Sequence, residues 1–109
     1  MEVGGKIFLL MVTQQSYDEV ANRLAKCLNS LAGDNKPREI DPDLSALRQW
    51  GLDSEDGVDM AADMGSQLGI EIPYDENPLV AESKSGQKRA RTFKEVVQYL
   101  LSFIEVREH

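Results

Sequence analysis

The sequence predicts an all-α fold, a small antiparallel helical bundle of three main helices plus short helical turns, joined by two long loops. Two capping motifs that begin apolar stripes with helical spacing support this fold, as does an acidic segment between them with its own cap and stop residue. A length of 109 residues suits one domain with a single hydrophobic core. Because 41% of the residues are hydrophobic and only 6% are aromatic, that core must rest mainly on aliphatic side chains.

A capping box predicts that the first helix begins at Ser16. In this motif Ser16 caps the helix start, and Glu19, three residues later, bonds back to it. Gly33 offers the left-handed backbone that ends a helix. Residues 1–15 form an N-terminal extension that the pattern leaves open as a strand, a helix extension or a frayed tail. The apolar stripe of this helix consists of Tyr17, Val20, Leu24, Cys27 or Leu28, and Leu31.

Residues 34–52 are predicted to form a long loop, because prolines and glycine interrupt any regular pattern there. Within this loop Asp41 and Pro42 predict a short helix, with Asp41 as the cap and Pro42 at the first helical position. Structured loops of this length are usually functional. Three apolar residues are expected to pin the segment onto the core: Leu44, Leu47 and Trp50.

A second full helix is predicted to begin at Asp53, which is a good cap, and to end before Gly69. Acidic side chains occupy one side of this helix. The opposite side is expected to carry small and apolar residues: Val58, Ala61, Ala62, Gly65 and Leu68.

Residues 74–91, rich in serine, glycine and charge, are predicted to form a long flexible loop. A second capping box at Thr92 and Glu95 then predicts the start of the final helix. We expect residues 16–106 to form one domain and residues 107–109 to form a tail. The apolar stripe of the final helix consists of Phe93, Val96, Val97, Leu100, Leu101 and Ile104.

Charge and composition exclude several classes of function. A net charge of −7 argues against nucleic-acid binding and suits partner proteins with basic docking patches. Cys27 is the single cysteine, so no internal disulfide is possible. The apolar run Ile7–Val12 is too short for a signal core or a membrane span, so we expect a cytoplasmic protein. The only histidine is His109, which removes histidine-based nucleophile pairs and most histidine zinc sites, so we expect neither an enzyme nor a metal site.

The most specific motif is Gly-Leu-Asp-Ser at Gly51–Ser54. It resembles the acyl carrier protein family, whose carrier serine lies in a Gly-x-Asp-Ser motif that opens the second helix. The match continues through an acidic helix to the Gly-Ile-Glu-Ile-Pro segment at Gly69–Pro73. Upstream, Ile40–Leu44 is similar to the family's loop before the motif. The resemblance covers residues 16–106 in order and implies an acyl-carrier-like carrier domain.

By this resemblance Ser54, preceded by Asp53, would receive a covalent 4′-phosphopantetheine arm from coenzyme A through a phosphopantetheinyl transferase. The arm would hold acyl intermediates as thioesters for partner enzymes in fatty-acid, lipid or polyketide-type biosynthesis. Such a carrier needs no catalytic residue of its own. A serine in the first turn of a helix would also place its phosphodiester beside unpaired amides and the positive dipole end. The plainer interpretation of Ser54 is helix capping.

In the family the acidic second helix is where partner enzymes dock. The corresponding residues here are Glu55, Asp56, Val58, Asp59, Met60 and Asp63. For any single charge among them, simple solvation of the helix face is the alternative. The family usually has leucine directly after the serine, where this chain has Glu55, and acidic residues late in the helix, where it has Gly65 and Ser66. These departures indicate a specialised carrier with its own partners.

Other interpretations stay open. An aminoacyl or peptidyl carrier would use the same serine and bundle, and a non-carrier helical adaptor would keep the bundle without the chemistry. We expect a monomer. Small residues of the second helix could leave room for an acyl chain or simply allow close packing: Gly57, Ala61, Ala62 and Gly65. The basic residues of the long loop could bind an anionic partner or the prosthetic-group phosphate, or merely be solvated: Lys84, Lys88, Arg89 and Arg91.

Overall fold

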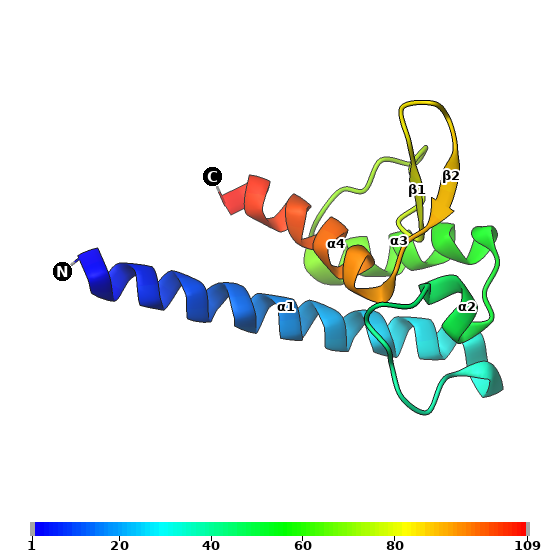
Figure 1. The fold of residues 1–109 in the computed structure, drawn as a ribbon, viewed down its shortest axis with the longest axis horizontal. Helices are drawn as coiled ribbons and strands as arrows, with labels where there is room; N and C mark the ends of the chain where they lie inside the picture. Colours follow the sequence, from blue (N-terminus) through cyan, green and yellow to red (C-terminus); the bar gives the residue numbers. More distant parts are fainter. Residues whose placement is uncertain (1, 109) are drawn as a thin grey trace.

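The computed structural model describes the backbone of residues 2–108 and the side chains of residues 16–104. Four α-helices make up most of the chain, and in Figure 1 α3 and α4 both run back along α1 in the opposite direction. The elements are α1 (Glu2–Ala32), a 3₁₀ turn (Gly33–Asn35), α2 (Ala46–Trp50), α3 (Ser54–Leu68), β1 (Val80–Glu82), β2 (Lys88–Ala90) and α4 (Phe93–Glu108). The predicted helical character is therefore confirmed, but the prediction of an all-α fold missed a small two-stranded sheet.

Helix α1 is longer than predicted, because it begins at Glu2 rather than at Ser16. Residues 2–15 are thus a helix extension, and the predicted cap at Ser16 is wrong, since that residue lies inside the helix. Figure 1 shows the N-terminal half of α1 extending beyond the other helices. The predicted end of the helix is confirmed: α1 stops at Ala32, and Gly33 has a positive φ of 61°.

The predicted short helix at Asp41 and Pro42 is wrong by several residues. Asp41 instead closes a turn, because its side chain accepts from the amide of Asp43 at 2.9 Å. Helix α2 begins only at Ala46 and is capped by Ser45, whose hydroxyl accepts from the Arg48 amide at 3.2 Å.

Of the three residues expected to pin this segment to the core, two do so. Trp50 is fully buried and Leu47 packs partly against the core, whereas Leu44 is 54% exposed. The segment is also held through its backbone, because the Leu44 carbonyl accepts from the amide of Phe93 at 3.0 Å. That bond ties the start of α4 to the loop that precedes α2.

Helix α3 has the predicted bounds but a different buried face. Asp53 caps it, and Gly69 ends it with a φ of 65°. The fully enclosed residues are Gly57, Met60 and Met64. The predicted buried face, which included Val58, is therefore wrong, since Val58 is 62% exposed. The buried residues lie about one position earlier along the helix.

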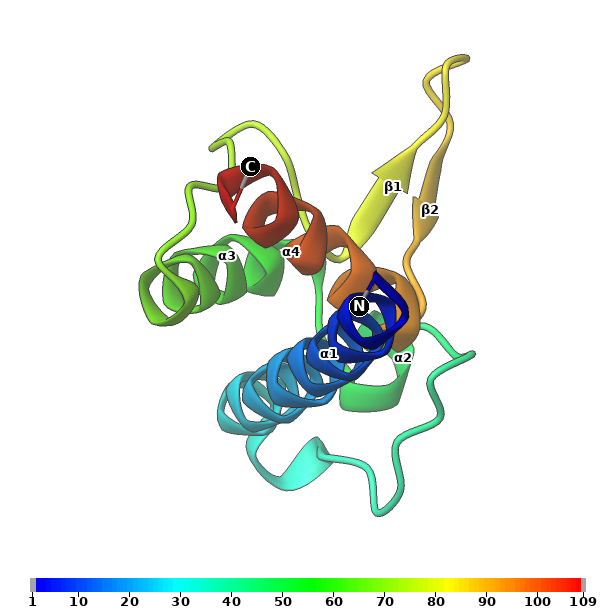
Figure 2. The same cartoon turned by 90° about the vertical axis from the view of Figure 1, so that its left-hand side faces the viewer.

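The segment predicted as a long flexible loop contains an antiparallel hairpin. Strands β1 and β2 pair in the register Val80↔Ala90, Ala81↔Arg89 and Glu82↔Lys88. The turn between them is closed at Ser83, whose amide donates to the Gln87 carbonyl at 2.8 Å. Figure 2 shows the hairpin rising away from the helices, with its base beside the start of α4.

Helix α4 begins with the predicted capping box. The Thr92 hydroxyl accepts from the Glu95 amide at 3.1 Å, and the Glu95 carboxylate accepts from the Thr92 amide at 3.0 Å. Arg89 of the hairpin adds a two-pronged ion pair to Glu95, with N–O distances of 2.7 and 2.8 Å. The cap therefore also fastens the hairpin to α4, which continues to Glu108, two residues beyond the expected domain end.

Stability should depend on the ionisation of Glu95. The hydrogen bonds from Arg89 and from the Thr92 amide lower the pKa of Glu95 from 4.5 to about 2. Because the folded state binds this proton more weakly than the unfolded state, the contribution of the carboxylate is present above pH 4.5 and is lost as pH falls toward 2. Glu95→Gln keeps an oxygen that can accept from the Thr92 amide but removes the negative charge at the helix start. We expect it to lower the free energy of unfolding at neutral pH by about 0.3–1 kcal/mol, the range for such a charge. The exposed pair with Arg89 adds little to this.

Urea unfolding of both proteins across this pH range tests the expectation. The difference between wild type and Glu95→Gln should shrink as pH falls from 4.5 to 2. A difference that stays constant with pH would show that the carboxylate is not ionised in the way described.

The core lies where α1, α3 and α4 meet, with α2 closing one end. Trp50 stacks on Phe93 with ring centroids 5.6 Å apart, and its indole nitrogen donates to the Asn29 side chain at 2.8 Å. The predicted stripes of the first and final helices are confirmed as core-facing. The buried hydrophobic residues are Val20, Leu24, Cys27, Leu28, Ala46, Trp50, Met60, Met64, Ile70, Leu79, Phe93, Val96, Val97, Leu100 and Leu101. Over the described part of the chain, each helix is too short or too polar to cross a membrane.

Candidate functional site

Ser54 is the first residue of α3 and is exposed. The helix cap is its neighbour Asp53, whose carboxylate accepts from the Asp56 amide at 3.1 Å while Asp56 bonds back to the Asp53 amide at 3.0 Å. Among the described residues the Ser54 hydroxyl has no hydrogen-bond partner. The capping interpretation of Ser54 is therefore wrong, and its hydroxyl is available for other chemistry.

The connection from α2 fixes where Ser54 is presented. Gly51 ends α2 with a φ of 62°, a conformation that favours glycine. The Leu52 amide then donates to the Leu47 carbonyl at 2.8 Å, so the chain turns back on α2 before α3 begins. The Gly-Leu-Asp-Ser motif is thus a tight turn between two helices, with the serine on its outer side.

Four of the predicted docking residues form an exposed face of α3. Glu55, Asp59 and Asp63 follow one another at intervals of four residues and are exposed. Val58 lies on the same outward side and is 62% exposed. This face, defined by Glu55, Val58, Asp59 and Asp63, is called the acidic face below.

The other two predicted docking residues behave differently. Met60 is fully buried in the core, so its place in a docking surface is wrong: it points inward with Met64, one helical turn away. Asp56 is half-buried and belongs to the capping box, which leaves its carboxylate committed to the backbone of Asp53.

The glycine at position 57 is explained by close packing rather than by space for a chain. A Cβ atom on Gly57 would overlap the side-chain amide of Asn77. The remaining small residues of α3 lie elsewhere: Ala61, Ala62 and Gly65 border a shallow outer depression together with the segment 70–74. These small residues therefore do not share one internal space.

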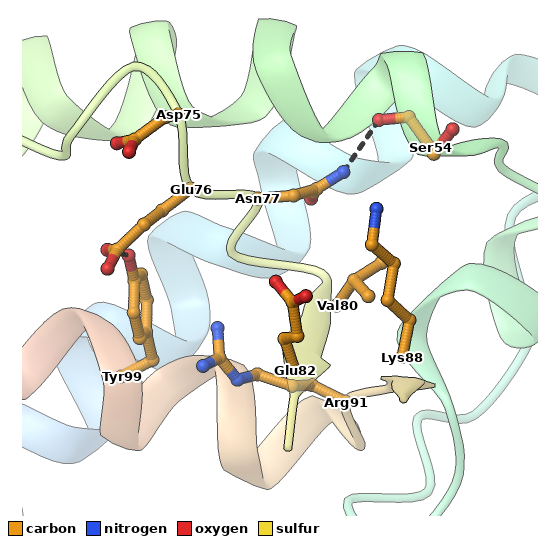
Figure 3. Close-up of a pocket in the computed structure, with 9 residues that line it drawn as sticks. All are labelled: Ser54, Asp75, Glu76, Asn77, Val80, Glu82, Lys88, Arg91 and Tyr99. Carbon is orange, nitrogen blue, oxygen red and sulfur yellow. Dashed lines mark hydrogen bonds between the residues drawn. The ribbon is translucent and has the colours of Figure 1, made fainter. Parts of the chain in front are cut away.

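A pocket of about 380 Å³ opens beside Ser54, and Figure 3 shows its lining. The pocket is formed by the start of α3, the segment 75–77, the hairpin and α4. Its walls are polar and carry charges of both signs. The lining residues are Ser54, Asp75, Glu76, Asn77, Val80, Glu82, Lys88, Arg91 and Tyr99.

Asn77 ties the pocket wall to Ser54. Its side-chain nitrogen donates to the Ser54 carbonyl at 2.8 Å, and its side-chain oxygen accepts from the Leu79 amide at 2.9 Å. The Val80 amide at the start of β1 also donates to the Asn77 carbonyl at 3.0 Å. The base of the hairpin is therefore held at a fixed place relative to the serine.

The far wall of the pocket is a bonded cluster that joins Tyr99 of α4 to the segment before β1 and to Arg91 between β2 and α4. The Tyr99 hydroxyl donates to Glu76, and the Arg91 guanidinium lies 4.1 Å from the centre of the Tyr99 ring. Burial, and after it the bond to Glu76, raises the pKa of Tyr99 above its ordinary value. Arg91 also donates to the Pro78 carbonyl at 3.2 Å. Because these groups bond to one another, this wall of the pocket is already formed. The raised pKa keeps Tyr99 neutral at physiological pH.

The basic residues of the hairpin segment separate into two groups. Lys88 and Arg91 line the pocket, whereas Arg89 pairs with Glu95 and Lys84 lies in the hairpin turn away from the pocket. In Figure 3 the Lys88 amine points toward the Ser54 end of the pocket. Within the described part of the chain this amine has no ion pair or hydrogen bond. The residue paired with Lys88 across the hairpin is the acidic Glu82.

Burial, with a smaller effect of the nearby Asp63, raises the pKa of the Cys27 thiol from 9.0 to about 12, so this thiol is a poor nucleophile. No group of three or more metal-ligating side chains occurs within the described residues, and His109 lies outside them. Comparison with models of known families, with curated proteins and with solved structures gives no match to this chain.

Proposed function

We propose that this protein is a carrier whose Ser54 bears a 4′-phosphopantetheine arm. In the loading step the Ser54 oxygen would attack the pantetheine-bearing phosphorus of coenzyme A. A new oxygen–phosphorus bond forms, the phosphoanhydride bond breaks, and 3′-phosphoadenosine 5′-phosphate leaves. The serine proton passes to a base of the transferase. The terminal thiol of the arm would then hold an acyl group as a thioester, and the carrier would deliver it to acyl-transferring or acyl-activating enzymes.

The observation that carries this proposal is the state of the Ser54 hydroxyl. It is exposed at the first residue of a 15-residue helix, and the capping that would normally occupy it is supplied by Asp53. The first-turn amides and the helix dipole favour negative charge at this end, so a phosphodiester there would be stabilised. Serine modification therefore needs no rearrangement of the helix start.

The acidic face supplies a means of recognition. Its three carboxylates, on Glu55, Asp59 and Asp63, repel one another along one side of α3, at a cost of about 0.2–0.5 kcal/mol per pair. The same row would attract a partner with a basic patch and orient it beside the serine. Val58, exposed beside this row, offers an apolar contact that would fix the register of docking.

The loading reaction tests the proposal. The protein is incubated with coenzyme A, magnesium and a broad-specificity phosphopantetheinyl transferase, and intact mass is measured. We expect the mass of one phosphopantetheine to be added, and peptide mapping should place it on the peptide that contains Ser54. Absence of the addition with several transferases would contradict the proposal and would favour an adaptor that binds partners without a prosthetic group.

A further inference from the structure

We propose that the pocket beside Ser54 holds the phosphopantetheine arm, with the Lys88 amine as the counter-ion of its phosphodiester. This inference rests on the proposed function and adds to it a place where the arm is stored and a residue that keeps it there. Three properties of the pocket support it: its position relative to Ser54, its polar lining and the unpaired state of Lys88.

The pocket begins at the attachment point. Ser54 is itself a lining residue, so an arm attached to its oxygen starts at the edge of the pocket. Asn77 fixes the opposite wall by its bond to the Ser54 carbonyl. The volume of about 380 Å³ falls within the roughly 300–1,000 Å³ range of pockets that bind small molecules. A fixed wall reduces the entropy that is lost when the arm docks.

The lining matches the chemistry of the arm. Pantetheine carries two amides and a hydroxyl, which need hydrogen-bond partners when they leave water. The Asp75 carboxylate and the Glu76 oxygen not bonded to Tyr99 can accept from the arm's amide hydrogens. The Arg91 nitrogens not bonded to Pro78 can donate to its carbonyls. A long aliphatic chain would find few apolar contacts among these residues, so we assign the pocket to the arm rather than to a fatty cargo.

Lys88 is the group best placed to meet the phosphate. Its amine points toward the Ser54 end of the pocket, and within the described residues it makes no ion pair. The other cation of the pocket, Arg91, is already engaged by the Tyr99 ring and the Pro78 carbonyl. Glu82 stands opposite Lys88 in the strand register and competes with a bound phosphate for the amine. The two side chains should therefore affect the arm in opposite directions.

The experiment compares the apo and loaded forms of the full chain. Amide NMR spectra of the two forms are expected to differ at Asn77, Val80, Lys88, Arg91 and Tyr99 as well as near Ser54. In parallel, the reaction of the arm's thiol with an aromatic disulfide reagent measures how often the arm leaves the pocket. Cys27 adds little background to this reaction, because its pKa is raised to about 12.

Three charge-neutralising variants provide the comparison. Lys88→Gln should make the arm's thiol react roughly 1.5- to 5-fold faster, the range that corresponds to one surface ion pair. Glu82→Gln should slow the thiol by releasing Lys88 to the phosphate. Lys84→Gln is the matched control, because it removes the same charge from the same hairpin but does not line the pocket. The difference between the two lysine variants should decrease at high salt, which screens such pairs.

The outcomes separate the two proposals. If no phosphopantetheine can be added, both the proposed function and this inference fail. If it is added but the spectral changes are confined to residues 53–57, the function stands and the pocket inference is overturned. If the hairpin amides respond but Lys88→Gln behaves like Lys84→Gln, the assignment of Lys88 as counter-ion is overturned.

Discussion

Replacing Ser54 with alanine is expected to abolish phosphopantetheine addition completely while leaving the free energy of unfolding within about 0.5 kcal/mol of wild type. The loss should be complete because, in the proposed loading reaction, the hydroxyl oxygen is the atom that bonds to phosphorus. The fold should be unaffected because that hydroxyl bonds to none of the described residues. Intact mass after the loading reaction gives the first readout, and urea unfolding followed by circular dichroism gives the second.

The neighbouring residue is the matched control. Asp53→Ala removes the cap of α3 and should lower the free energy of unfolding by about 0.5–2 kcal/mol. If Ser54→Ala destabilised the protein as much as Asp53→Ala, the serine would have a structural role instead. If Ser54→Ala still accepted the group, another exposed hydroxyl would be the attachment point, and peptide mapping would identify it.

The largest effect on stability is expected for Trp50→Ala, which should lower the free energy of unfolding by about 3–5 kcal/mol. The indole is fully buried, stacks on Phe93 at 5.6 Å and donates to Asn29. Its removal leaves a cavity between α1, α2 and α4. Since small domains are stable by only about 5–15 kcal/mol, this variant should unfold at a clearly lower urea concentration.

Two further variants test whether this loss comes from the buried ring. Trp50→Phe keeps an aromatic ring on Phe93 and loses the bond to Asn29, so it should cost about 1 kcal/mol. Tyr74→Ala removes another aromatic side chain, but one that is 99% exposed, and should change stability by less than about 0.5 kcal/mol. A loss below about 1.5 kcal/mol for Trp50→Ala would show that the core adjusts around the missing ring. Because Trp50 ends the helix that leads into the Gly-Leu-Asp-Ser turn, loading of Ser54 should also slow in this variant.

Helix starts were predictable from the sequence only where the chain before them breaks. The capping boxes at Ser16 and Thr92 have equivalent spacing, yet only the second caps a helix. Thr92 follows a strand, whereas residues 1–15 contain no proline that would stop a helix from continuing through Ser16. A capping box indicates that a helix can begin at its first residue, but it does not show whether the residues before it are also helical.

The buried face of α3 and the hairpin were missed for a different reason. Small and apolar residues occur on both sides of α3. The sequence was therefore compatible with a buried stripe through Val58 as well as with the observed one through Gly57, Met60 and Met64. The strands of the hairpin are only three residues long, too short for alternation to be seen. The available signal was the five-residue turn with Gly86 between two short runs, which is typical of a hairpin.

The position of Ser54 at a helix start was predictable because its motif is local. The pocket was not, because its walls come from residues 75–77, the hairpin and α4, which are distant in sequence. Only folding brings Asn77 to the carbonyl of Ser54 and Lys88 to the same space. Local sequence patterns therefore located the serine at the helix start but not its surroundings.

The contact between Gly57 and Asn77 divides the surface around Ser54 into two sides. On a helix with about 3.6 residues per turn, Glu55 and Asp59 project from nearly the opposite direction to Gly57. The hairpin thus stands behind α3, and the carboxylates stand in front of it. If the protein is the proposed carrier, a partner enzyme could bind the acidic face while the arm is still held in the pocket. Partner recognition and release of the arm would then be successive events that different substitutions can separate.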